Sequence, residues 1–171
     1  MKLGFLLGST ILLTLPAAAV AQAPTDPQIT AIVVAANNTD IDAGKLALKH
    51  ATNKDVRAFA QQMVTDHSAV NAAATKLVTK LHVTPEANAT SKELTAGGVA
   101  ARAKLTAAPK AGFDKAYIDN EVAYHQAVID AIDKTLIPSA QNAELKTLLV
   151  QSRPAFVAHL DHAKQIQASL Q

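Results

Sequence analysis

The sequence predicts an all-α fold, an up-down bundle of four helices with a long crossover between the second helix and the third. Apolar residues recur at alternating spacings of three and four along four long segments, which is the pattern of amphipathic helices. Alanine, the strongest helix former, is abundant, and no alternating strand pattern recurs. The chain has no cysteine, so helix packing rather than disulfides must hold the fold.

A targeting segment precedes the predicted helices. Lys2 supplies a positive start, residues 3–15 form a short apolar run, and small residues at alternate positions follow it. We therefore predict a cleavable signal peptide, residues 1–21, with cleavage after Ala21 or Ala23 and export to the periplasm or beyond the cell. A permanent membrane anchor needs about 20 apolar residues, which is more than this run provides.

The mature chain is predicted to be a single bundle domain, residues 27–171, with almost no net charge. Loss of Lys2 with the signal lowers the formal charge of +2 by one. A near-neutral surface gives no electrostatic reason to bind nucleic acid or anionic lipid. No integral membrane segment is expected after cleavage. The sequence indicates no protein partner, and it leaves a monomer and a homo-oligomer equally open.

The first two predicted helices cover residues 27–50 and 54–81. Each carries one continuous apolar stripe, and very few residues separate the two segments. Either Thr52 or Asn53 can cap the second helix, because a side-chain oxygen at that position accepts from the free N–H groups of the first turn. The short link predicts that these helices are antiparallel neighbours.

The second pair of helices is predicted at residues 112–136 and 142–170. Residues 82–110 break the helical period with glycines and prolines, and we interpret them as a crossover with a short helix within residues 91–105. Such a connection is needed when the second and third helices run parallel. Pro154 lies inside the last helix, where it removes one backbone hydrogen bond and is expected to cause a kink.

Each of the four predicted helices carries an ionisable residue on its apolar stripe. Burial of a charge is costly unless the charge is paired or bound to a metal ion, so these positions indicate a polar site inside the bundle. At about 1.5 Å of rise per residue, the two aspartates lie within ~3 Å of one level, whereas the two histidines are offset by ~9 Å. The last loop or a kink at Pro154 would have to absorb that offset. The stripe residues are Asp40, Asp66, His125 and His159, and His67 lies beside the stripe of the second helix.

Four segments resemble the helix motifs of the exported bacterial domain of unknown function 4142, a family placed among ferritin-like folds. The resemblance implies a ferritin-like four-helix bundle with an export signal, and it supplies no established activity. The first-helix acid of the family is usually glutamate, whereas this chain has the shorter Asp40. The matching segments are Asp40–Ala47, Val56–His67, Phe113–Ile118 followed by His125, and Pro154 followed by His159–Leu160.

The spacing of the ionisable residues favours a looser metal site over a di-iron centre. Ferritin-like di-iron proteins carry a Glu-x-x-His motif on two helices, and this sequence has none. Glu121 and His125 are spaced i, i+4, and His159 and His162 are spaced i, i+3, so each pair can face one ion. Imidazole and carboxylate ligands suit copper, zinc, nickel or iron. We predict a transition-metal ion bound by Asp66, His67, His125 and His159, with Asp40, Glu121 and His162 as weaker candidates.

Two other functions fit the same residues. In the first, Asp66 pairs with His125 or His159 and Asp40 pairs with His67, and the polar layer only fixes helix pairing in a structural or stress-related interaction protein. In the second, less favoured, the protein is a metal-dependent oxidase, although the full carboxylate set is missing. No nucleophile, phosphate-binding or dinucleotide motif indicates another reaction, so we expect that the protein is not an enzyme.

Overall fold

The computed structural model describes residues 22–170, so the predicted signal peptide lies outside the described residues. Within this part of the chain all regular structure is helical and no strand occurs, which confirms the all-α class. The elements are α1 (Asp26–His50), α2 (Lys54–Leu81), α3 (Ala89–Ala107), the 3₁₀ turn η1 (Lys110–Gly112), α4 (Phe113–Ala131), the π-helical segment η2 (Ile132–Leu136), α5 (Ile137–Ser139) and α6 (Ala143–Ser169).

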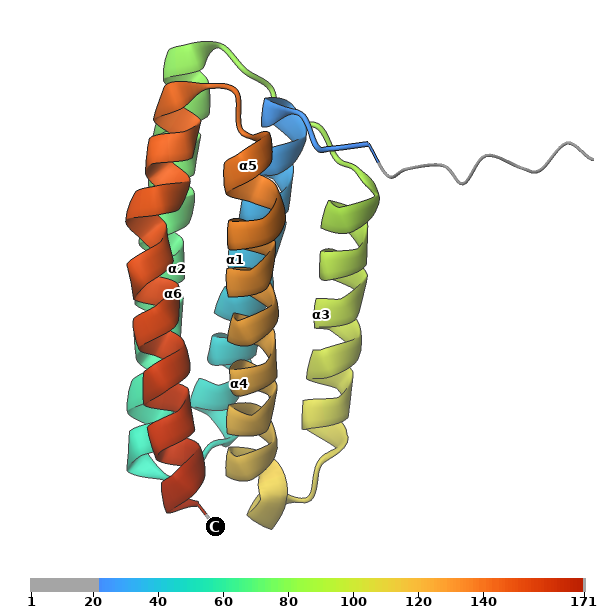
Figure 1. The fold of residues 1–171 in the computed structure, drawn as a ribbon. Coiled ribbons are helices and arrows are strands. Elements are labelled where there is room, and N and C mark those ends of the chain that lie inside the picture. Colours follow the sequence, from blue (N-terminus) through green and yellow to red (C-terminus); the bar gives the residue numbers. More distant parts are fainter. Residues whose placement is uncertain (1–21, 171) are drawn as a thin grey trace, which may run out of the picture.

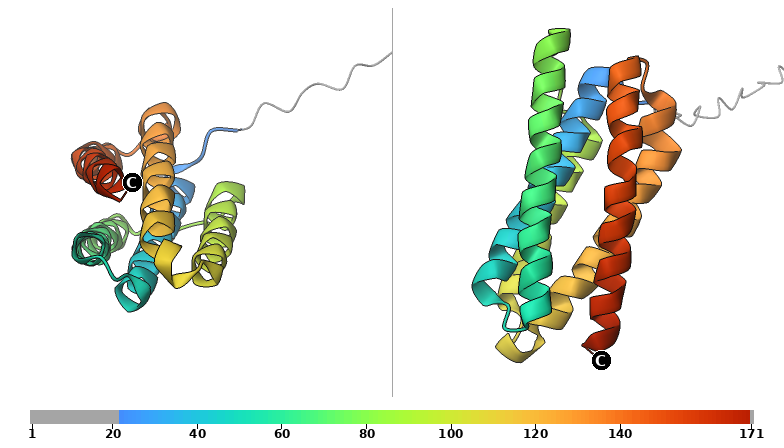
Figure 2. Two further views of the ribbon diagram at one scale, coloured as in Figure 1. Left: turned by 90° about the horizontal axis from the view of Figure 1, so that it is seen from below. Right: turned by 90° about the vertical axis from the view of Figure 1, so that its left-hand side faces the viewer.

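Helices α1, α2, α4 and α6 lie side by side around a common core, and α3 packs against the outside of α1 (Figures 1 and 2). Among these four helices, α1 packs most extensively against α2 and α4 against α6, and α2 also packs against α6. The chain descends through α1, ascends through α2, and returns through α3 before it ascends again through α4 (Figure 1). Helices α2 and α4 therefore run in the same direction, and α3 is the connection that this arrangement requires.

The helix boundaries follow from polar side chains at the first turns. Asn53 caps α2, since its Oδ1 accepts from the N–H groups of Asp55 at 2.8 Å and Val56 at 3.3 Å. Asn142 caps α6 in the same way. Asp26, in the first turn of α1, accepts from the N–H of Asn142 at 2.9 Å and so ties the start of α6 to the start of α1.

The connections differ from the sequence prediction in two places. The crossover helix α3 covers 19 residues, more than the predicted 91–105, and Asn88 caps it by accepting from the N–H of Ser91 at 2.9 Å. The third predicted helix does not end at residue 136, because α4 continues through η2 into α5 and stops at Ser139. Helix α6 runs through Pro154 without interruption.

The core consists of two apolar clusters with a polar layer between them. One cluster surrounds Phe59, Met63 and Tyr117, and the other surrounds Ile29 and Leu149. Along α1 the residues of the two clusters stand on either side of the polar positions, so the layer lies near the middle of the bundle. None of the described helices is long and apolar enough to cross a membrane.

Gly44 allows α1 and α2 to approach closely. A Cβ atom at Gly44 would lie 2.9 Å from the backbone oxygen of Ala60 and 3.0 Å from Cγ2 of Val64. Backbone cannot move aside as a flexible side chain can, so the space at Gly44 depends on the absence of a side chain. Gly97 in α3 has no such neighbour, because an added Cβ there meets nothing within 4 Å.

We expect Gly44→Ala to lower the free energy of unfolding by about 1–3 kcal/mol, because the added methyl group forces the α1–α2 backbones apart. The matched variant Gly97→Ala should raise it by up to about 1 kcal/mol, because alanine is the better helix former. Urea denaturation followed by circular dichroism measures both. Equal effects of the two substitutions would contradict the close contact at Gly44.

Candidate metal centre

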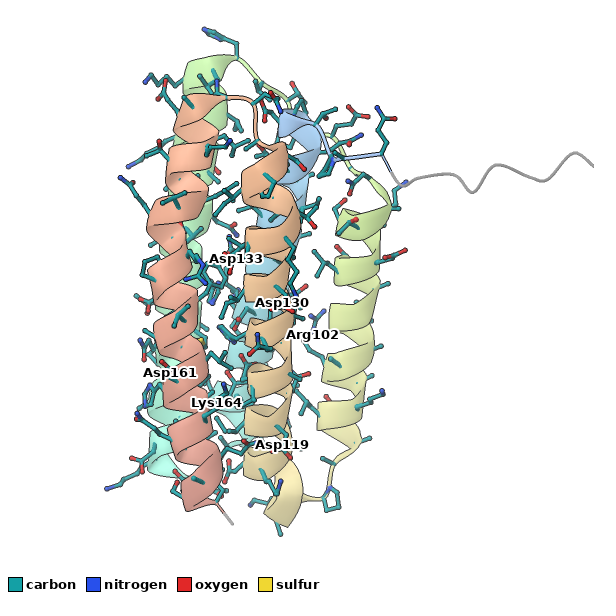
Figure 3. All side chains as sticks on the ribbon, viewed as in Figure 1. Arg102, Asp119, Asp130, Asp133, Asp161 and Lys164 are labelled. Carbon is teal, nitrogen blue, oxygen red and sulfur yellow. The ribbon has the colours of Figure 1, made fainter. Side chains whose placement is uncertain are left out.

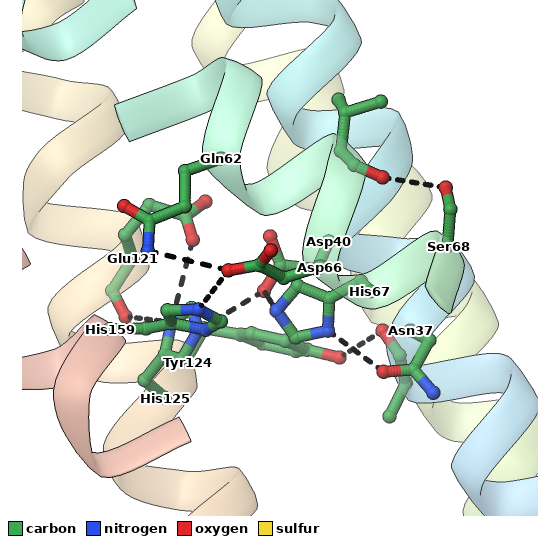
Figure 4. A network of polar contacts seen from close by, with 12 residues as sticks. Asn37, Asp40, Gln62, Asp66, His67, Ser68, Glu121, Tyr124, His125 and His159 are labelled. Carbon is green, nitrogen blue, oxygen red and sulfur yellow. Dashed lines mark hydrogen bonds and ion pairs between the residues drawn. The ribbon is translucent and has the colours of Figure 1, made fainter. Parts of the chain in front are cut away.

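Four helices contribute ionisable side chains to one buried layer (Figure 4). Helix α1 supplies an aspartate, α2 a histidine, α4 a glutamate and a histidine one turn apart, and α6 a histidine. All five side chains are almost completely removed from solvent, which is unusual for groups of this kind. The exposed fractions are 1% for Asp40, 1% for His67, 0% for Glu121, 0% for His125 and 3% for His159.

The structure corrects the prediction for α2. The sequence pattern placed Asp66 on the buried stripe and His67 beside it, but His67 is the buried residue and the Asp66 side chain is 40% exposed. Adjacent helical residues point about 100° apart, so only one of the two can face the layer. The buried face of α2 passes through Phe59, Met63 and His67. Asp66 therefore lies at the edge of the layer, at the seam with α6.

The weaker sequence candidates are distributed unequally. Asp40 and Glu121 lie inside the layer, whereas His162 lies outside it, half-buried with its ring centroid 5.4 Å from that of Phe59. The predicted offset between His125 and His159 is absent, since their ring centroids are 5.5 Å apart. The helical stretch after His125 includes the π-helical turn η2. Because a π-helix rises less per residue than an α-helix, this turn shortens the axial distance from His125 to the end of the helix and so reduces the offset.

Each buried histidine donates a hydrogen bond from one ring nitrogen to an oxygen that can only accept. This bond fixes the tautomer, because the donating nitrogen must carry the proton and the other nitrogen is left with a lone pair. Outer hydrogen bonds of this kind orient the imidazoles of metal sites. The three donations are from His67 Nδ1 to Asn37 Oδ1 at 2.8 Å, from His125 Nδ1 to the backbone oxygen of Glu121 at 3.0 Å, and from His159 Nε2 to Asp66 Oδ2 at 2.9 Å.

A chain of amide side chains holds the acceptor of His67 in place. Asn37 donates from Nδ2 to Asn71 Oδ1 at 3.0 Å, and Asn71 donates from Nδ2 to Asn38 Oδ1 at 2.8 Å. The chain fixes which end of the Asn37 amide faces His67, since Nδ2 is already engaged with Asn71. Sequence analysis missed this support, although Asn37 lies three residues before Asp40 and hence on the same side of α1.

The atoms that face one another inside the layer have no hydrogen-bond partner within residues 22–170. Buried polar atoms are nearly always paired, and a bound cation would satisfy a group of acceptor atoms that face one another in this way. Tyr117 Oη, next to the layer, is in the same condition. The unpaired atoms of the layer are His67 Nε2, His125 Nε2, His159 Nδ1, both carboxylate oxygens of Asp40 and both carboxyl oxygens of Glu121.

The distances between these atoms match the spacing of ligands around one metal ion. Asp40 Oδ2 lies 3.1 Å from Nε2 of His67 and 3.4 Å from Nε2 of His125. Tetrahedral bonds of about 2.0–2.1 Å place neighbouring ligand atoms roughly 3.3–3.4 Å apart. One ring nitrogen from each of His67, His125 and His159 lies within 4.8 Å of the other two, and so do ligand atoms of Asp40, Glu121 and His125. The residues present therefore fit a transition-metal ion.

The electrostatics of the layer favour an anionic Asp40 among neutral groups. Burial opposes its ionisation, but the contact with His67 and the proximity of His125 and His159 outweigh burial and lower the Asp40 pKa. Burial and the neighbouring Asp40 charge raise the pKa of Glu121 well above its usual range, which favours the protonated, neutral form of this carboxyl. Burial lowers the pKa of His125 to about 4 and also lowers that of His159.

Aromatic rings close the layer against water. Phe156 packs edge-on against His67, with ring centroids 5.1 Å apart, and Phe59 lies 6.5 Å from His125. Tyr124 donates from its hydroxyl to the backbone oxygen of Ala36 at 2.8 Å, which ties α4 to α1 beside the layer. A low-dielectric surround of this kind strengthens the attraction between Asp40 and any cation bound there.

The family model for the domain of unknown function DUF4142 matches residues 13–166. The chain belongs to this family. Among solved structures, a crystal structure of a DUF305 fragment from Deinococcus radiodurans resembles it with a TM-score of 0.70 and 12% sequence identity, covering 86% of this chain and 99% of that chain. At this identity the likeness establishes a shared fold and no more. A search of curated proteins found no match.

We expect His125 to make this DUF4142 protein without metal less stable as the pH is lowered from 6.5 toward 4. His125 titrates near 6.5 when unfolded and near 4 when folded, so the unfolded state binds more protons in this window. The slope for one such group is about 1.4 kcal/mol per pH unit. Glu121, with its raised pKa, contributes in the opposite direction above about pH 4.5.

Urea unfolding in the presence of a chelator, repeated between pH 4.5 and 7, measures the effect. His125→Gln should reduce the number of protons taken up on unfolding by about one, which lowers the slope of stability against pH. His82→Asn, at an exposed position, is the control and should leave that slope unchanged. An unchanged slope in His125→Gln would show that another group is responsible.

Proposed function

We propose that this protein is an exported, periplasmic, ferritin-like four-helix bundle that binds a single transition-metal ion in its core. The observation that carries the proposal is the buried group of His67, His125 and His159, with the Asp40 carboxylate beside His67 and His125. Each of these residues has a ring nitrogen or carboxylate oxygen without a hydrogen-bond partner. A cation would satisfy these atoms together. Hydrogen bonds among these side chains cannot replace the cation. The proton of each imidazole is on the nitrogen that points out of the layer, so the inner nitrogens carry lone pairs and have no proton to donate.

The proposed ligands are His67, His125, His159 and Asp40. Glu121 lies beside them and would lose its proton to become a further ligand or counter-charge when a cation is bound. Three imidazoles with a carboxylate suit copper, zinc or iron. In place of the ligand role suggested by the sequence, Asp66 acts as the hydrogen-bond partner that orients His159.

Export rests on the sequence before the described residues. A cleavable signal at residues 1–21 would release a single domain, residues 27–171, into the periplasm. The charge balance gives no support for a nucleic-acid partner, and no described helix can span a membrane. Metal handling in that compartment does not require a catalytic cycle, so we propose a binding protein rather than an enzyme, and a metal-dependent oxidase is not favoured because Glu-x-x-His is missing.

One observation favours the architectural alternative. Asp66 and His159 form a direct carboxylate–imidazole hydrogen bond of 2.9 Å, as expected for a polar layer that only fixes helix pairing. The second pairing that this alternative needs is poorer. Asp40 Oδ2 and His67 Nε2 are 3.1 Å apart, but their contact does not have the geometry of a hydrogen bond.

Metal binding is tested by titrating the chelator-treated mature protein with Cu²⁺, Zn²⁺ and Fe²⁺ in an isothermal calorimeter. We expect one ion per chain, and we expect Asn37→Ala to weaken binding about 10–100-fold, because His67 loses the partner that orients its ring. Asn38→Ala is the matched control, since this exposed neighbour ends the amide chain and does not touch the histidine. Asp40→Asn, which removes the buried charge, should weaken binding further.

Two results would argue for the architectural alternative instead. One is binding no tighter than that of an unrelated helical protein. The other is equal affinity in Asn37→Ala and Asn38→Ala, with Asp40→Asn more stable than the parent because an uncompensated buried charge has been removed.

A further inference from the structure

We propose that the metal ion enters the buried layer at Asp66, through the seam between α2 and α6, with His159 as the first buried ligand on its path. This inference rests on the proposed metal-binding function. A site sealed inside a helical bundle needs an entry path as well as ligands. The contacts of Asp66 and of the buried imidazoles distinguish this path from the others.

Solvent exposure falls in steps along this path. The Asp66 side chain is 40% exposed, the His159 side chain that it contacts is 3% exposed, and His67 and His125 beyond them are 1% and 0% exposed. Figure 4 shows Asp66 and His159 next to each other, with Gln62 on the outer side of Asp66. Within the described residues, Asp66 is thus the half-exposed carboxylate that directly contacts one of the three imidazoles.

The other two imidazoles are covered by neutral groups, which attract a cation less strongly than a carboxylate does. Nδ1 of His67 faces the Asn37 amide, which is itself bonded to Asn71. Nδ1 of His125 faces the backbone of α4, and rings of Phe59 and Phe156 flank the imidazole. Passage on these sides would require the helix backbone or a neutral amide chain to open.

Asp66 presents a free carboxylate oxygen to solvent. Both of its hydrogen bonds, from His159 Nε2 at 2.9 Å and from Gln62 Nε2 at 3.3 Å, go to Oδ2. No Lys or Arg within residues 22–170 forms an ion pair with it, in contrast to Asp133, which holds Arg153. Oδ1 is therefore available to attract a hydrated cation through its negative charge.

The far wall of this seam is α6, a helix weakened by an internal proline. Pro154 lies five residues before His159 in α6 and has no N–H to donate to the carbonyl of Val150, so one backbone hydrogen bond of the helix is missing there. Segments with fewer internal hydrogen bonds open at lower free energy than the rest of a fold. Movement of α6 away from α2 would uncover Nδ1 of His159 without disturbing the α1–α2 contact.

The test is stopped-flow mixing of the chelator-treated protein with Co²⁺, whose visible absorption reports coordination, at low ionic strength. Asp66→Asn keeps an acceptor for His159 and removes only the charge, so we expect the association rate to fall about tenfold with little change in the dissociation rate. Added salt should narrow the difference between parent and variant. Asp161→Asn is the matched control, because Asp161 is an exposed carboxylate on α6, the helix that carries His159, and it forms no hydrogen bond or ion pair with the layer (Figure 3).

A second variant tests the movement of α6. Pro154→Ala restores the missing backbone hydrogen bond, so association and dissociation should both slow by a similar factor while the affinity stays the same. If Asp66→Asn instead raises the dissociation rate and leaves association unchanged, Asp66 only orients His159 and the entry proposal is wrong. If the parent protein itself gives no Co²⁺ spectrum and binds no other ion, the proposed function fails first, and the entry path fails with it.

Discussion

The structure depends on one electrostatic constraint, a carboxylate buried in the middle of a helical bundle. Asp40 is 1% exposed and ionised, and burial alone would make that state costly. In the proposed function this cost is offset by a cation held between Asp40 and the imidazoles brought from α2, α4 and α6, so the polar layer couples α1 to three other helices.

The apolar core supports that layer from both sides. The cluster around Phe59 and Tyr117 and the cluster around Ile29 and Leu149 hold the helices at fixed separation above and below it. Hydrogen bonds at the helix ends add to this support. Asp26 of α1, for example, accepts hydrogen bonds from the backbone N–H groups of Gln141 and Asn142, the two residues before α6. The positions of the ligand atoms are thus set by packing rather than by the loops, which is the arrangement that a preorganised metal site needs.

Helical periodicity predicts the bounds of α1, α2 and α6 almost to the residue, because each of these helices has one solvent-exposed face and one buried face. It predicted the site less well. Asp66 and His67 fit the stripe of α2 almost equally well, and only the direction of α6 decides between them. The sequence identifies Glu121 only weakly as a site residue, because its i, i+4 spacing to His125 is also that of an ordinary pair on a helix surface. The π-helical turn after α4, which follows His125 by seven residues, has no local sequence signal.

The amide chain from His67 to the surface couples the layer to the outside of the molecule. It alternates between helices, from α2 to Asn37 on α1, back to Asn71 on α2, and out to Asn38 on α1. Hydrogen bonds in series polarise one another, so a change in electron density at the imidazole is passed along every member. Loading a cation on the inner nitrogen of His67 would make its outer N–H a stronger donor and tighten each link. Cation binding would therefore strengthen the hydrogen bonds that hold α1 against α2. Because the series ends at the exposed Asn38, its effect would reach the protein surface.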